Sequence, residues 1–127
     1  MNHIKIFILS FCILSCSPAF RDFNQAKNYA KKGLHDEAVF HSFLSLMKRP
    51  DNQKTIDLFE SSYIKAVDKH NQSLSTLFEI SDGSKWPDVV KEYKALKVLN
   101  DYLKQIKPLL EQEVSYTLNL EYKDYSS

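Results

Sequence analysis

The side chains that could bind a metal or catalyse a reaction are few and scattered. Glu37 and His41 lie four residues apart, so on a helix both can face one side and share a metal ion with a third ligand. The sequence has no His-Glu-x-x-His spacing, no serine in a nucleophile elbow and no glycine-rich phosphate loop, and its two glycines are too few for a phosphate cradle. We therefore expect Glu37 and His41 to form an exposed helix pair, with no metal, no cofactor, no small-molecule substrate and no enzymatic activity.

Cys16 follows a segment with the pattern of a signal peptide. The apolar run at 6–14, interrupted only by Ser10, has the length of a signal core. It is too short to span a membrane, which takes about 20 residues. Ile13-Leu14-Ser15-Cys16 resembles the processing box of bacterial lipoproteins. The resemblance implies cleavage between Ser15 and Cys16 and attachment of acyl chains such as palmitate to Cys16; an ordinary signal peptide is the alternative.

Cleavage at this box changes the charge and the thiol content of the protein. It removes Cys12 and Lys5, which leaves 16 basic and 16 acidic residues. Acylation of Cys16 then leaves no free thiol for a disulfide or a zinc site. A neutral protein has no general electrostatic attraction to nucleic acid, so none is expected as a partner. Five lysines make part of the stretch 88–107 basic, which suits either anionic lipid headgroups or solvent: Lys91, Lys94, Lys97, Lys104 and Lys107.

The apolar spacing that must position these residues is helical. A length of 127 residues with 43% hydrophobic residues predicts one folded domain, and two glycines and four prolines are too few for a many-stranded sheet. Apolar residues recur at three- and four-residue steps. The predicted helices cover 20–32, 36–49, 53–67, 72–80 and 88–107. Gly33 ends the first, Pro50 follows the second, and Pro108 closes the last, which is the most strongly amphipathic.

Beyond Pro108 the period of the sequence changes from that of a helix to that of a strand. Apolar residues alternate with polar ones from Val114 to Tyr122, which predicts a half-buried β-strand. A single strand cannot satisfy its own backbone. The strand is therefore expected to pair with another molecule or to begin a missing unit, and a frayed tail is the alternative.

The residues around the first predicted turn resemble a tetratricopeptide repeat. Tyr29, Gly33, Ala38 and Pro50 stand where the family has its first-helix tyrosine, turn glycine, small packing residue and closing proline. Tyr63 follows Tyr29 by 34 residues, which is the repeat length. In the second unit Val67 and Gln72 replace the glycine and alanine, so that hairpin must turn differently; a chance helical hairpin is the alternative. Because fewer than about three repeats rarely stand alone, the long helix is expected to cap them.

The arrangement over residues 15–122 also resembles tetratricopeptide-type lipoproteins of Gram-negative bacteria. The short motifs that carry this resemblance are Ser15-Cys16, residues 33–39, Gly83 with Trp86, Tyr93 with Leu96, and Pro108-Leu109-Leu110. The resemblance implies a cell-envelope location, at the outer membrane, and a helical scaffold with no established activity. The predicted organisation is a signal peptide at 1–15, a lipidated tether at 16–19, an all-α helical domain at 20–110 and a strand-like tail at 111–127.

The partner surface is expected on the first helices, which line the concave side in this repeat family. The candidate residues there are Asn24, Lys27, Asn28, Lys31, Thr55, Leu58 and Ser62. Aromatic side chains that could anchor a partner are Trp86, Tyr93, Tyr116, Tyr122 and Tyr125, although Trp86 is expected mainly to hold the loop at 81–87 against the helices. The expected function is protein binding or scaffolding on a membrane anchor. The alternative is a truncated N-terminal module without activity of its own.

Overall fold

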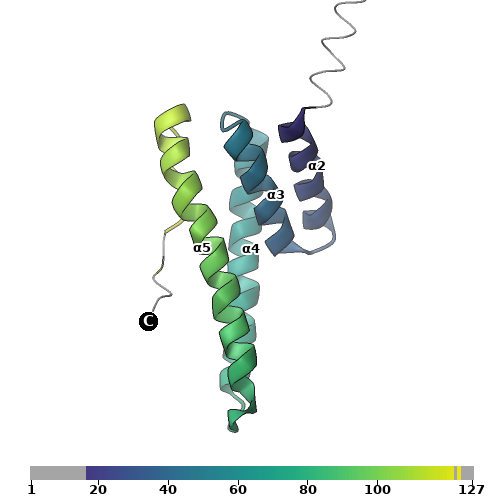
Figure 1. Ribbon diagram of the computed structural model, residues 1–127, viewed down its shortest axis with the longest axis vertical. Helices are drawn as coiled ribbons and strands as arrows, with labels where there is room; N and C mark the ends of the chain where they lie inside the picture. Colours follow the sequence, from purple (N-terminus) through teal and green to yellow (C-terminus); the bar gives the residue numbers. More distant parts are fainter. Residues whose placement is uncertain (1–16, 122, 124–127) are drawn as a thin grey trace, which may run out of the picture.

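The computed structural model describes residues 17–121 and residue 123, and it confirms an all-α fold. The elements, in chain order, are α2 (Pro18–Lys31), α3 (His35–Lys48), α4 (Gln53–Phe78), the short 3-10 helix η1 (Gly83–Lys85) and α5 (Trp86–Val114). Consecutive helices are antiparallel, and α4 and α5 extend well beyond α2 and α3 (Figure 1). The molecule is therefore thick at the end where α2 begins and only two helices wide at the other end.

The α2–α3 hairpin follows from local signals that the sequence contains. Ser17 caps α2, its Oγ accepting a hydrogen bond from the Phe20 amide at 3.2 Å, and Pro18 occupies the first turn. Gly33 adopts φ +76°, a left-handed conformation that a side chain disfavours. Asp36 then lies in the first turn of α3, where a negative charge suits the helix dipole.

Helix α4 corrects the prediction of two separate helices at 53–67 and 72–80. It runs without interruption from Gln53 to Phe78, capped by Asn52, whose side chain accepts from the Lys54 amide at 3.1 Å. No glycine or proline stands between Val67 and Gln72 to stop it. Ala66 and Leu74 are buried on either side of that stretch, so packing continues along the helix. The second hairpin turn expected from the repeat pattern does not exist.

Helix α5 corrects the prediction that Pro108 closes the last helix. Pro108 lies inside α5, which continues to Val114. Proline removes one backbone hydrogen bond from a helix interior, at a cost of about 3 kcal/mol. Ile106 and Leu110 are both fully buried on either side of it, and their packing keeps the helix in place. The helix ends where Ser115 adopts φ 53°.

The segment after α5 is not the β-strand that the alternation predicted. Among the described residues from 115 onward, none forms a β-strand or a β-bridge. The alternation itself is real, because Leu118 and Leu120 are buried while Thr117 and Asn119 are exposed. An extended backbone produces this pattern with or without a neighbouring strand. Tyr122 and Tyr125 lie outside the described residues.

Side chains of α5 hold the backbone of this segment. Lys107 Nζ donates to the Leu120 carbonyl at 2.7 Å, and the Lys123 amide donates to Asn100 Oδ1 at 2.9 Å. The prediction failed because it assumed that only another strand could satisfy an extended backbone. The segment packs on its own helices instead.

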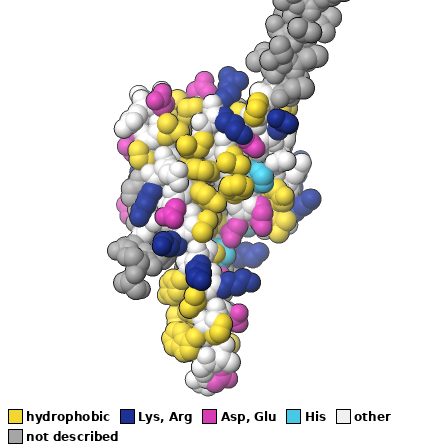
Figure 2. Space-filling model, viewed as in Figure 1, with side chains coloured by type: hydrophobic (Ala, Val, Ile, Leu, Met, Phe, Trp, Pro, Cys, Tyr) yellow, Lys and Arg dark blue, Asp and Glu magenta, His cyan; other side chains and the backbone are white. Residues whose placement is uncertain are grey.

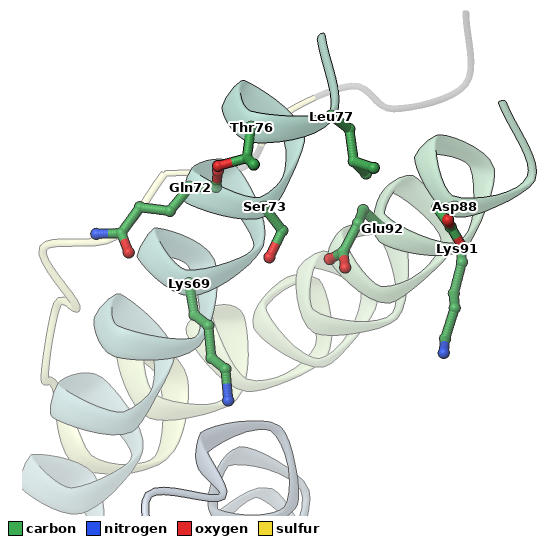
Figure 3. Close-up of a pocket in the computed structure, with 8 residues that line it drawn as sticks. All are labelled: Lys69, Gln72, Ser73, Thr76, Leu77, Asp88, Lys91 and Glu92. Carbon is green, nitrogen blue, oxygen red and sulfur yellow. The ribbon is translucent and has the colours of Figure 1, made fainter. Parts of the chain in front are cut away.

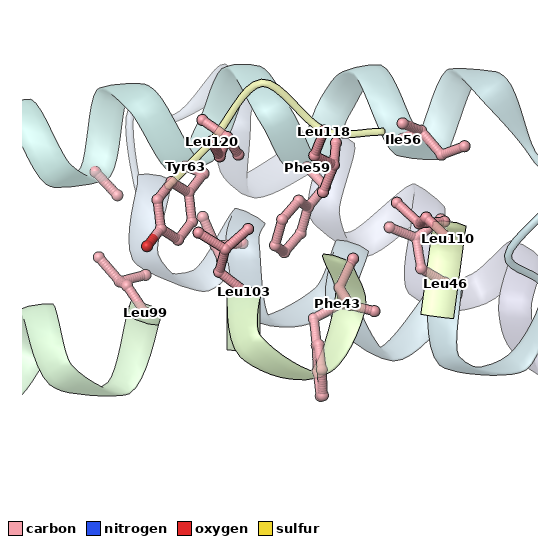
Figure 4. Packing of buried hydrophobic residues seen from close by; sticks show 13 residues of the cluster. Phe43, Leu46, Ile56, Phe59, Tyr63, Leu99, Leu103, Leu110, Leu118 and Leu120 are labelled. Atoms are coloured by element: carbon pink, nitrogen blue, oxygen red, sulfur yellow. The ribbon is translucent and has the colours of Figure 1, made fainter. Parts of the chain in front are cut away.

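Two groups of buried apolar side chains form the interior. The larger, shown in Figure 4, joins α3, α4, α5 and the C-terminal segment, and we call it the main core. Its members are Val39, Phe43, Leu46, Ile56, Phe59, Tyr63, Ala66, Leu99, Leu103, Ile106, Leu110, Leu118 and Leu120. The smaller one, the distal cluster, consists of Leu74, Val89 and Leu96 between α4 and α5 alone. Val67 packs against both and marks the boundary between them.

Candidate functional site

A shallow apolar hollow lies between α3 and α5, and we call it the α3–α5 groove. Its volume is about 250 Å³, and it is lined by Asp36, Glu37, Phe40, Ala95, Val98, Leu99 and Tyr102. Phe40 is 38% exposed and Val98 48% exposed, and the Phe40 and Tyr102 rings lie 5.8 Å apart. Hydrophobic side chains gather in the middle of this face of the molecule (Figure 2). The helices thus leave a set of adjacent apolar side chains open to solvent.

One edge of the groove is acidic, and its acid belongs to a bridge between three helices. His70 of α4 contacts Asp36 of α3 through Nε2, at 2.7 Å from Oδ2, and contacts Glu92 of α5 through Nδ1. The His70 side chain is largely buried, and those of Asp36 and Glu92 are more exposed. We call these three residues the His70 bridge. It ties the start of α3 to both helices of the α4–α5 hairpin.

The His70 bridge favours a protonated imidazole. Both ring nitrogens of His70 face a carboxylate, and both can donate hydrogen bonds only in the charged form. Burial alone lowers the pKa of His70, but the hydrogen bonds that the ring donates to Glu92 and Asp36, together with their negative charges, outweigh it and raise the pKa above its ordinary value. Burial and the Asp36 charge likewise raise the pKa of the Tyr102 phenol at the groove. With both nitrogens engaged, His70 is placed to hold helices together rather than to transfer protons.

A larger but more polar depression opens between α4 and α5 near the end of the hairpin. Its volume is about 520 Å³, and it is lined by Lys69, Gln72, Ser73, Thr76, Leu77, Asp88, Lys91 and Glu92. Figure 3 shows that Ser73 and Glu92 face the space between the helices, whereas the ends of Gln72 and Lys91 point away from it. Its charges are mixed in sign and do not converge on one point. The depression therefore has no chemical preference that identifies a ligand.

The turn between α4 and α5 carries an exposed aromatic cluster, which we call the aromatic tip. The Phe78 and Trp86 rings meet edge to face with centroids 6.5 Å apart, and Ile80 beside them is exposed. Lys85 Nζ lies 5.8 Å from the Phe78 centroid and 5.3 Å from that of Trp86. Trp86 thus contacts the end of α4, as expected for a residue that holds the turn, yet more than half of it remains exposed.

Glu37 and His41, the pair on α3 that could share a metal ion, do not meet a third ligand among the described residues. His41 stacks on Tyr29 with ring centroids 5.1 Å apart, while Glu37 is exposed at the groove. Among the residues that the structure describes, no three His, Cys, Asp or Glu side chains are grouped as metal ligands. The sequence does not reveal the His70 bridge, because its three members are far apart in the chain. No short-range spacing could have revealed it.

The predicted partner surface is only partly exposed. Lys27, Asn28 and Lys31 are exposed on α2, and Asn24 and Leu58 are partly buried. Thr55 and Ser62 are buried, so they do not belong to the exposed surface of α4. They share a face of α4 with Phe59 and Ala66, both fully buried, and that face packs into the molecule. Ser15 and Cys16 lie outside the described residues.

Comparisons with protein-family models, with curated proteins and with solved structures each gave no match, so the candidate sites stand on their own geometry. In the part of the chain that the structure describes, no helix combines the length and the apolar character that crossing a membrane requires.

Proposed function

We propose that this protein is a lipid-anchored component of the cell envelope, at the outer membrane, whose helical domain binds another protein and acts as a scaffold. The observation that carries the binding role is the α3–α5 groove, where Phe40, Val98 and Tyr102 form an open apolar surface. Contiguous exposed apolar side chains with a polar edge are typical of protein interaction sites.

The anchor is supported by the sequence around Cys16. The apolar run ends in Ser15-Cys16, and Ser17 immediately afterwards caps the first helix of the domain. Metabolic labelling with a fatty acid tests the anchor directly. The wild type should incorporate label and fractionate with membranes, and a Cys16→Ser variant should do neither. Equal labelling of both proteins would contradict the anchor.

We further propose that α2 and α3 form a tetratricopeptide-type hairpin. Gly33 has the left-handed conformation that a tight turn favours, Ala38 is fully buried where the two helices meet, and Pro50 follows α3. The likeness is limited to this one unit. Tyr29 is partly exposed, whereas Tyr63, its counterpart 34 residues on, is buried in the main core.

The chemistry of the groove suggests the kind of segment that it binds. Its floor is apolar, whereas Asp36 and Glu37 make one edge negative. A partner segment with an aliphatic or aromatic side chain next to Lys or Arg would complement both features. Such a segment could be one turn of an amphipathic helix laid along α5.

A photocrosslinking amino acid at position 98, in the full chain in its own membrane, tests this role. Ile64 on α4 is 46% exposed, close to the 48% of Val98, but does not line the groove, so position 64 is the matched control. We expect a crosslinked protein from position 98 and none from position 64. The crosslinked peptide should contain an apolar residue beside Lys or Arg. Equal products from both positions, or an acidic peptide, would contradict the proposal.

A further inference from the structure

The expected lipid carrier stands very close to the folded domain. Cys16 is separated from the first helical residue, Pro18, only by the capping residue Ser17. One extended residue spans about 3.3–3.6 Å, so an acylated Cys16 would hold the start of α2 within roughly 10 Å of the bilayer surface. The anchor therefore restricts not only where the domain is but which end of it meets the lipid.

Three pieces of the chain meet at that end of the domain. Ser45 Oγ in the last turns of α3 donates to the Ala19 carbonyl at the start of α2, at 2.7 Å. A small cavity of about 110 Å³ lies between the start of α2, the end of α3 and the turn before α4. It is lined by Ser17, Ala19, Phe20, Phe23, Ser45, Arg49 and Asn52.

The side chains at this end suit a membrane surface. Phe20 is 45% exposed and Met47, in the last turn of α3, is 47% exposed. Arg21, Lys48 and Arg49 stand next to them in the chain and are exposed. Within the described residues Lys48 pairs with Asp22, and neither arginine forms an ion pair. Lys and Arg side chains gather beside the point where the described chain begins (Figure 2). Apolar side chains that enter the interface beside cations that reach lipid phosphates are the usual composition of a membrane-bound surface.

The other charged residues at this end of the domain indicate which side of it suits an anionic membrane surface. Asp51, in the turn before α4, and Lys54, in the first turn of α4, carry opposite charges. Glu111 and Glu113 are exposed at the end of α5. In Figure 1 the end of α5 and the start of α2 lie on opposite sides of the thick end. The cations are thus concentrated on the α2–α3 side. An anionic bilayer would attract that side and repel the end of α5.

We propose that Phe20, Arg21, Met47, Lys48 and Arg49, here called the basal face, lie on the bilayer that holds the Cys16 acyl chains. This inference rests on the proposed lipid anchor. The α4–α5 hairpin then stands away from the membrane. Helix α4 has 26 residues and is about 40 Å long, so the aromatic tip lies far beyond the reach of the lipid. The exposed rings of Phe78 and Trp86 then face the aqueous phase and not the bilayer.

The single tryptophan of the chain makes this orientation measurable. Trp86 is at the aromatic tip, so its fluorescence reports on that end without a label. The full, acylated protein would be placed in vesicles of phosphatidylethanolamine and phosphatidylglycerol whose acyl chains carry bromine, a quencher of tryptophan. A second protein, Phe20→Trp in a Trp86→Phe background, reports on the basal face.

We expect Trp86 to be unquenched and the tryptophan of Phe20→Trp to be quenched. Quenching of Trp86 alone would reverse the orientation, quenching of both would mean that the domain lies flat, and quenching of neither would mean that the basal face does not touch lipid. Each of these three results overturns the proposal. Sedimentation of the same samples tests the anchor separately, because a protein without acyl chains stays in the supernatant whichever way its domain is oriented.

A charge-reversal pair tests the contribution of the basal cations. Arg21→Glu with Arg49→Glu, made in the Phe20→Trp protein, should lose the quenching while the protein still sediments with the vesicles. Lys65→Glu with Lys97→Glu, at exposed positions of α4 and α5, is the matched control and should keep it. Equal quenching in both pairs would overturn the role of the basal cations. Circular dichroism of each variant confirms that its helices remain folded.

Discussion

The two ends of the α4–α5 hairpin differ in how they are supported. At the thick end, α4 and α5 pack against α3 and the C-terminal segment through the main core of thirteen residues. At the thin end they have only each other, through Leu74, Val89 and Leu96. The His70 bridge lies one turn beyond Val67, where one cluster gives way to the other. The thick end is therefore expected to open only when the whole domain unfolds, whereas the thin end is expected to open by local unfolding.

Truncation of Phe59 should have the largest effect on stability. Its ring is fully buried in the main core and contacts Tyr63, with centroids 5.9 Å apart. We expect Phe59→Ala to lower the free energy of unfolding by about 3–5 kcal/mol, because a large cavity would open between three helices. Urea unfolding followed by circular dichroism measures this. A loss below about 1 kcal/mol would mean that the main core is not the cooperative unit.

Truncation of Leu74 should have a smaller and more local effect. Leu74 is buried in the distal cluster, where solvent is close on most sides and the helices can close over a cavity. We expect Leu74→Ala to cost about 2–3 kcal/mol, near the low end for buried leucines. Hydrogen exchange should speed up at residues 72–92 and stay slow around Phe59. Faster exchange throughout the chain would show that the two clusters unfold together.

The His70 bridge should make the junction between the two ends sensitive to pH. Because the pKa of His70 is raised in the folded protein, its stabilising contribution is complete below the ordinary histidine pKa of about 6.5 and is lost as pH rises through the folded pKa. We expect the free energy of unfolding to fall as pH rises across that window. Loss of the bridge over the same rise in pH should also weaken the protection of the amides at the start of α3 against hydrogen exchange.

Variants of the bridge separate this effect from other titrations. His70→Gln cannot carry the charge, so its stability should not show the fall. Glu92→Gln removes one of the two carboxylates that face the ring and should reduce the fall without abolishing it. If the stability of His70→Gln fell with pH as much as that of the wild type, another group would be responsible.

The outcome of the sequence predictions depends on whether the deciding interaction is local. Gly33 and the periodic apolar residues of the first two helices mark those helices correctly, because turn residues and amphipathic faces are short-range features. Pro108 and the residues between Val67 and Gln72 misled the prediction, because the packing of Leu110, Ala66 and Leu74 decides those positions.

The extended C-terminal segment and the two candidate sites show the same limit more strongly. The alternation at 114–120 correctly indicated which side chains point inward, but not that Lys107 and Asn100 would hold the backbone. The His70 bridge and the α3–α5 groove both depend on how the start of α3 lies across the hairpin. That position follows from tertiary packing of three helices and has no sequence motif of its own.

Substitution of Gly33 should have the smallest effect, because it acts on the peripheral α2–α3 turn. Apart from the two adjacent residues, no heavy atom of the described residues lies within 4 Å of a Cβ built at Gly33, so only the φ of +76° opposes a methyl group there. We expect Gly33→Ala to cost about 1 kcal/mol and Gly33→Asn less, since asparagine tolerates the left-handed region better. Thermal unfolding of the wild type, Gly33→Ala and Gly33→Asn gives the order of their stabilities. Faster hydrogen exchange in Gly33→Ala should be limited to α2 and the start of α3, and a loss as large as that of Leu74→Ala would mean that this turn supports the whole fold.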